Sequence, residues 1–280
     1  MAFAALGFSG TICRDLVVGN QSILEQTLIW FGIFALLRGR LWLFCTLIIL
    51  CGQLKILPLV LLALVLLTDS PHKWRYFAGS IVACLLVAAG VYLWDPVDSR
   101  TFVGLMSDVA FMEPGGAIHP CARTLIRDLT ADALKFFAEV SEPPTVKSVA
   151  HPIYAAYALG VLGVLIRVAR RGRDLRTAVF LALLTYALIA PRMKDYSYIL
   201  VLVPTFELVR DRLARGGSIR WLVVGVVAAL TLPGLDLFWK YRSFMLVAWV
   251  WAISLPARRA VPGPGSAERT EFSSPRRTSP

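Results

Sequence analysis

A lysine in the middle of a long apolar run is the residue whose position most clearly requires a chemical reason. Lys55 lies inside the run 41–67, and Pro58 follows three residues later. A charge at mid-membrane depth costs about 2.5–3.5 kcal/mol, and a proline bends or breaks a helix. The pattern indicates an anion site at a broken membrane helix. The alternative is a kinked span whose lysine reaches an interface, but Lys55 is far from both ends of the run.

A second group of charges lies in the segment 191–198, which follows another apolar run. Arg192 and Lys194 are suited to phosphate because charge-assisted hydrogen bonds are the stronger class. Together with Lys55 they form a predicted phosphate or pyrophosphate site. Two alternatives remain, in which Arg192 and Lys194 are charges at the rim and Asp195 caps the following helix.

No acid stands out as the general base that a proton transfer would need. The weak candidates for this role are Asp15, Glu113 and Asp195. Further candidates for the site are Gly19, Asn20, Gln21, Pro58, His119, Arg123 and Tyr196. A solvated loop explains Glu113, His119 and Arg123 nearly as well as contacts to a substrate do.

The composition predicts an all-α, polytopic membrane protein. The 280 residues are 57% hydrophobic, with mean hydropathy +0.67, which exceeds what a soluble domain of this size carries. The net charge of +11 resides mainly in short clusters between apolar runs, as the positive-inside rule predicts. Membrane lipids are therefore the expected partners, and nucleic acid is not. The scattered histidines and the absence of a C-x-x-C spacing predict no metal site.

The apolar runs predict about seven to nine membrane helices or half-helices. Besides 41–67, the expected spans are 23–37, 76–94, 153–168, 177–190, 197–209, 221–232 and 244–255. Residues 1–257 form the membrane domain with an outer loop at 95–150, in which 123–137 is an amphipathic surface helix. Residues 258–280 are rich in Pro, Ser, Arg and Gly and form a disordered cytoplasmic tail.

Two topologies are open for the run 41–67. A single crossing would place Arg38 and Lys73 on opposite sides of the membrane. A re-entrant hairpin that turns near Lys55 would place every dense basic cluster on the cytoplasmic side. Such a break in the backbone is tolerated where it is buried in protein or lines a cavity. We favour the hairpin, with the Lys55 turn directed to the outer side.

The order of several short motifs resembles glycosyltransferase family 87, a group of GT-C membrane mannosyltransferases. The motifs are Arg-Asp-Leu…Gly-Asn-Gln-Ser at 14–22, an Arg-Gly-Arg loop, and Gly-x-x-Lys-x-x-Pro at 52–58. Glu-Pro-Gly-Gly-Ala-Ile-His-Pro at 113–120 and Ala-Pro-Arg-Met-Lys-Asp-Tyr-Ser-Tyr at 190–198 follow. The resemblance implies a metal-independent transfer of a hexose, such as mannose, from a polyprenyl-phosphate sugar to an acceptor hydroxyl. It also implies the outer face of a bacterial plasma membrane.

The resemblance has one departure near the N-terminus. Such enzymes carry a catalytic aspartate ahead of the Gly-Asn-Gln turn, and here only residues 1–13 precede the first motif. The chain is therefore expected to correspond to the C-terminal part of such an enzyme, inactive or incomplete without an N-terminal half. The alternative function is a transporter or lipid-binding membrane protein for an anionic substrate. The sequence contains no second Gly-x-x-Lys-x-x-Pro motif, which favours the enzyme.

Overall fold

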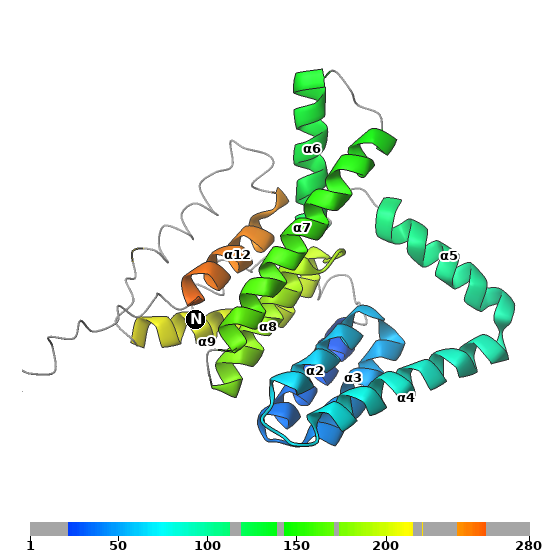
Figure 1. Ribbon diagram of the computed structural model, residues 1–280, viewed down its shortest axis with the longest axis vertical. Helices are drawn as coiled ribbons and strands as arrows, with labels where there is room; N and C mark the ends of the chain where they lie inside the picture. Colours follow the sequence, from blue (N-terminus) through cyan, green and yellow to red (C-terminus); the bar gives the residue numbers. More distant parts are fainter. Residues whose placement is uncertain are drawn as a thin grey trace, which may run out of the picture.

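The part of the chain that the structure describes is helical and contains no β-strand. The computed structural model describes residues 22–112, 119–138, 143–170, 174–214, 220 and 240–255. Figure 1 shows a layer formed by α2, α3 and α4 beside a second group formed by α7, α8, α9 and α12, with α5 and α6 extending from them. The all-α fold class is confirmed.

The predicted break at Lys55 is present and reverses the chain. Helix α2 (Ser22–Leu37) packs along α3 (Leu41–Leu54), and α3 packs along the 3-10 helix η1 (Leu57–Leu67). Lys55 adopts an extended backbone (φ −151°, ψ 133°), and Pro58 lies in the first turn of η1. A side chain at Gly52 would overlap Leu59, since an added Cβ would lie 2.3 Å from Leu59 Cδ2. Glycine therefore allows the two arms to approach closely.

The two arms bring the basic connections to one end of this layer. In Figure 1 the turn between α2 and α3 and the segment between η1 and α4 (Lys73–Trp94) both lie at its lower end. The turn between α3 and η1 lies at the opposite end. Gly39, at φ +73°, closes the first of these connections. The backbone thus has the hairpin shape that the sequence predicts.

Among the described residues, two helices are long and apolar enough to cross a membrane. They are α4 and residues Thr145–Ala169 of α7 (Pro143–Ala169), with 22 and 25 residues, and only 6% of the most apolar 18-residue stretch of each is buried. At 1.5 Å per residue these lengths correspond to about 33 and 38 Å, which match the hydrocarbon core of about 30 Å. They give weak support for a membrane protein. Five further apolar helices, α2, α3, η1, α8 and α12, are shorter.

The segment 95–150, which is predicted to lie on the outer side, is largely helical. It contains α5 (Pro96–Met112) and α6 (Ala122–Ala138), and α7 begins at Pro143, earlier than the expected 153. Asp95 starts α5, because its Oδ1 accepts hydrogen bonds from the backbone N–H groups of Val97 and Asp98 at 3.1 and 3.0 Å. α5 was not expected from the sequence, because its polar composition resembles that of a loop. The amphipathic helix expected at 123–137 corresponds to α6.

The second group of helices surrounds α8 (Leu175–Ile189), which is buried over most of its length. The expected span 197–209 divides into the 3-10 helix η2 (Asp195–Val201) and α9 (Leu202–Ala214). α12 (Arg242–Ser254) packs against α8 and α9, and the indole N–H of Trp251 donates to Thr185 Oγ1 at 3.0 Å. The span expected at 221–232 and the tail 258–280 lie outside the described residues. α8 thereby anchors both helix groups, since η1 also packs on it.

Candidate functional site

The Lys55 ammonium forms an ion pair with a residue that the predicted site does not include. Its Nζ donates to Oε2 of Glu25, in the first turn of α2. The side chain of Glu25 is 8% exposed and that of Lys55 is 34% exposed. The thiol of Cys51 also donates to the backbone carbonyl of Glu25 at 3.7 Å. The carboxylate is therefore enclosed between α2 and α3, and its partner lies at the hairpin turn.

This ion pair changes the interpretation of Lys55. A buried charge that has an opposite partner is much less costly than one without, although desolvation still offsets much of the attraction. Glu25 balances the positive charge of Lys55 within the protein, so a bound anion is not needed to balance it. The sequence contained a signal for Glu25, because an acid inside the apolar run 23–37 is as unusual as the lysine inside 41–67.

Tyr186 connects the ion pair with α8. It is buried, and it lies close enough to Glu25 and Cys51 to interact with both electrostatically. Tyr186 lies about one turn before the end of α8 at Ile189. The Glu25–Lys55 pair is therefore near the end of α8 from which the segment with Arg192 and Lys194 continues.

That segment is held against the start of α6. The fully buried Tyr198 donates through its phenol to the carbonyl of Pro120. The thiol of Cys121 donates to the carbonyl of Pro191 at 3.4 Å. The hydroxyl of Thr124 in turn donates to the carbonyl of His119, which is buried. The structure thus brings together two motifs that are about 70 residues apart in the sequence.

Arg192 and Lys194 lie between these two anchoring contacts and are partly exposed. Lys194, with an extended backbone, occupies the N-cap position of η2 and makes no side-chain capping bond there. Asp195 is the first residue of η2, so it does not hold the cap position that the sequence allowed. η2 packs against α2 as well as α8. The two cations therefore belong to a fixed segment beside the helix that carries Glu25.

Arg123 lies in the same region, on the first turn of α6. Burial lowers the pKa of its guanidinium from the ordinary value, and the neighbouring Cys121 and Tyr154 oppose this shift. Tyr154 comes from α7, and its phenol donates to the carbonyl of Ile189 at the end of α8. Arg123 is thus a half-buried cation at the junction of α6, α7 and α8.

A second polar contact joins α6 to α12. The phenol of Tyr241, which is fully buried, donates to Asp128 Oδ2 at 2.6 Å. Asp128 also pairs with Arg127, whose Nη2 lies 2.9 Å from Oδ1. These bonds fix the position of α6 on the helix group around α8. The role of Asp128 is therefore structural.

Several predicted site residues lie outside the described part of the chain. They are Asp15, Gly19, Asn20, Gln21 and Glu113. The side chains of Asp195 and Tyr196 are also outside it. Pro58 is buried in the hairpin. Within the described residues, no group of three or more His, Cys, Asp or Glu side chains could hold a metal ion.

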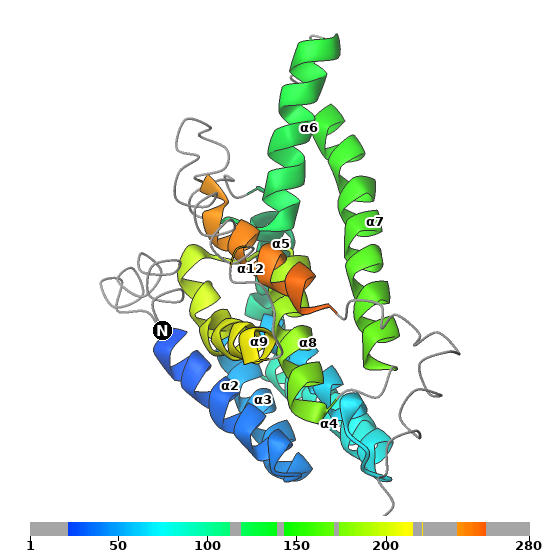
Figure 2. The same ribbon diagram turned by 90° about the vertical axis from the view of Figure 1, so that its left-hand side faces the viewer.

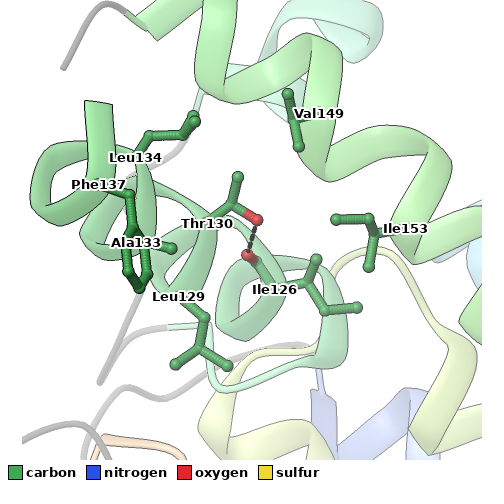
Figure 3. Close-up of a pocket in the computed structure, with 8 residues that line it drawn as sticks. All are labelled: Ile126, Leu129, Thr130, Ala133, Leu134, Phe137, Val149 and Ile153. Atoms are coloured by element: carbon green, nitrogen blue, oxygen red, sulfur yellow. Dashed lines mark hydrogen bonds between the residues drawn. The ribbon is translucent and has the colours of Figure 1, made fainter. Parts of the chain in front are cut away.

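Two apolar hollows lie on the helix surfaces. The first, about 390 Å³, lies between α6 and α7, and Figure 3 shows its lining of Ile126, Leu129, Thr130, Ala133, Leu134, Phe137, Val149 and Ile153. Its only polar lining residue, Thr130, donates its hydroxyl proton to the carbonyl of Ile126 at 2.6 Å. The second, about 620 Å³, lies between α2 and the η2–α9 segment. The first hollow offers no group for chemistry beyond hydrophobic contact.

Comparisons of this chain with protein families, with curated proteins and with solved structures found no match.

Proposed function

We propose that this chain is a multi-pass membrane protein that takes part in moving a sugar from a polyprenyl-phosphate donor to an acceptor hydroxyl. The observation that carries the proposal is the Glu25–Lys55 pair at the turn of a broken apolar hairpin. A cation and a carboxylate at one point inside an apolar protein supply the two groups that such a transfer requires. One stabilises the charge of the leaving phosphate, and the other accepts a proton.

The reaction assigns one role to each partner of the pair. The bond between the anomeric carbon of the sugar and the phosphate oxygen breaks, and the phosphate leaves with the electron pair. Lys55 exchanges Glu25 for this phosphate. The released carboxylate of Glu25 accepts the proton of the acceptor hydroxyl, whose oxygen bonds to the anomeric carbon. Glu25 thereby replaces the weak candidates Asp15, Glu113 and Asp195 as the first choice for the base.

Arg192 and Lys194 supply further positive charge on the phosphate. Their segment is fixed at both ends by buried side chains and packs on α2 through η2. A fixed cation loses less entropy on binding an anion than a mobile one does. The Glu25–Lys55 pair has no net charge, so these two residues provide the attraction that brings the phosphate to the site.

The proposed orientation places this site on the outer face of a bacterial plasma membrane. With the hairpin re-entrant, the basic connections around Arg38 and Lys73 lie on the cytoplasmic side. Arg176 and Arg210, which both pair with Glu207, come from the start of α8 and the end of α9. These helix ends lie opposite the end of α8 that leads to Arg192. The dense basic clusters thus lie on the side opposite the proposed site, as the positive-inside rule predicts. This arrangement fits the proposed seven to nine membrane helices or half-helices.

Donor binding tests the proposal directly. Purified full-length chain in detergent should bind a polyprenyl-phosphate mannose, as measured by equilibrium dialysis of a radiolabelled donor. Charge-assisted hydrogen bonds contribute about 1.5–3 kcal/mol each, so Arg192→Ala should weaken binding by about one to two orders of magnitude. Arg100→Ala is the matched control, because Arg100 is on α5 and bonds only to the exposed Tyr92 hydroxyl among the contacts observed.

Three outcomes separate the candidate functions. Transfer to an acceptor that is lost in Glu25→Gln, with donor binding retained, supports Glu25 as the base. Donor binding without transfer in any acceptor mixture fits both the alternative, an anion-binding or transport protein, and a transferase that is incomplete without an N-terminal half; net movement of the donor across a vesicle membrane then identifies the transporter. Equal donor affinity in the wild type and in Arg192→Ala contradicts the phosphate site.

A further inference from the structure

The groove between α2 and the η2–α9 segment contains a polar group that the proposed transfer does not use. Gln26 lines this groove, is 8% exposed, and its Oε1 is enclosed without a hydrogen-bond partner among the described residues. A buried carboxamide oxygen without a partner destabilises the fold, because it has lost its hydrogen bonds to water. A group that is retained at this cost points to a ligand that completes its hydrogen bonds.

The rest of the groove is apolar and aromatic. Apart from Gln26 and Thr27, its lining consists of Trp30, Phe31, Phe34, Ile199, Leu202 and Val203. The α2 residues recur at the spacing of one helix face, from 26 to 34, which corresponds to about 12 Å along the helix axis. The side chains of Phe31 and Val203 remain 62% and 46% exposed. The polar residues lie at the N-terminal end of this face and the aromatic residues follow, so the groove has a polar end and an apolar body.

We propose that this groove binds a membrane lipid that has a hydroxyl-bearing head group, with the hydroxyl on Gln26 and one hydrocarbon chain along Trp30 and Phe31. A hydroxyl both donates and accepts, so it can bond the carboxamide in either orientation. The chain replaces water along the exposed aromatic and aliphatic side chains, which is the favourable part of binding. The site is separate from the phosphate site, because Glu25 faces the hairpin whereas Gln26 lines the groove.

Fluorescence quenching of Trp30 tests this proposal in the full-length chain. The probe is a monoacylglycerol brominated in mid-chain, and the comparison probe is the methyl ester of the same brominated acid, which lacks hydroxyls. The quenching signal that disappears in Trp30→Phe reports on the groove. We expect saturable quenching by the monoacylglycerol, with an affinity about three- to tenfold higher than that of the ester, because one hydrogen bond is lost.

Three variants, one of them a control, identify the cause of that preference. Gln26→Leu should remove the preference for the hydroxylated probe, while Gln53→Leu should keep it, since Gln53 is an exposed glutamine on α3 that bonds to the carbonyl of Ile49. Val203→Trp fills the groove from its exposed side and should abolish saturable quenching. Val203→Trp leaves Gln26 intact, so it tests the groove even if Gln26→Leu folds poorly.

Three results would overturn the proposal. The first is quenching that rises without saturation, which indicates lipid that only surrounds the protein. The second is equal affinity for the two probes in the wild type. The third is a preference that persists in Gln26→Leu. None of these depends on Lys55 or Arg192, so a failed groove and a failed phosphate site can be told apart by the donor-binding assay.

Discussion

Breaking the Glu25–Lys55 pair from one side should destabilise the protein, whereas removing both charges together should not. An unpaired Lys55 would predict that Lys55→Met leaves folding intact or improves it, because a buried charge is removed. The ion pair reverses this expectation. Lys55→Met leaves the carboxylate of Glu25, only 8% exposed, without its partner.

The size of the effect follows from the exposure of each partner. Removing one member of a buried pair costs about 3–5 kcal/mol, and the 34% exposure of Lys55 reduces this. We expect about 2–3 kcal/mol for Lys55→Met and about 1 kcal/mol for Glu25→Gln, which leaves the more hydrated ammonium. The double variant should be within about 1 kcal/mol of the wild type.

Thermal unfolding in detergent measures these differences. For domains of 150–250 residues, 1 kcal/mol corresponds to about 2–4 °C in Tm, so Lys55→Met should lower Tm by about 4–12 °C. The double-mutant cycle should give a coupling energy of at least about 2 kcal/mol, because the single effects sum to about 3–4 kcal/mol and the double variant stays within about 1 kcal/mol of the wild type. Gln53→Leu, on the same helix, is the control. Additive single effects, or a Lys55→Met variant that melts like the wild type, would refute the assignment of the pair as a structural contact.

Two further predictions concern the hairpin. Gly52→Ala should lower stability by about 1–3 kcal/mol in the same assay, because the added methyl overlaps the Leu59 side chain. Cysteines introduced at Gly39 and Ser70, in a chain without its native cysteines, should both resist an impermeant thiol reagent in intact cells. A cysteine at Thr101, exposed on α5, should react.

Each of these predictions has a control and a contrary outcome. Gly79→Ala, on α4, meets no atom within 4 Å and should be neutral or stabilising by up to about 1 kcal/mol, since alanine favours a helix. Equal effects of the two alanine substitutions would show that the two arms are not in close contact. Labelling at Ser70 but not at Gly39 would show that the run crosses the membrane once.

The helices could be predicted from the sequence where apolar residues define them. The expected spans 23–37, 76–94, 177–190 and 244–255 differ from α2, α4, α8 and α12 by only a few residues. The break at Lys55 was also predictable, because Pro58 and an isolated charge mark it. α5 was not predicted, since its polar composition resembles that of a loop and its start depends on the Asp95 cap.

The contacts of the candidate site were less predictable. Charge and position pointed to Lys55, Arg192 and Lys194, but pairing depends on which helix faces overlap, and Glu25 is 30 residues from Lys55 in the sequence. The bond from Tyr198 to the carbonyl of Pro120 spans 78 residues and leaves no pattern in the composition. Buried polar contacts between distant segments are therefore the part that required the structure.

The Glu25–Lys55 pair has a consequence for biogenesis, because Glu25 is synthesised before Lys55. At about 5–20 residues per second, the 30 residues between the two partners take about 1.5–6 s to make. During this interval the carboxylate of Glu25 has no lysine partner, so in the proposed membrane arrangement α2 alone would be a poor segment for release into lipid. We expect α2 to remain at the insertion machinery until the hairpin emerges. α2, α3 and η1 would then leave as one inserted unit.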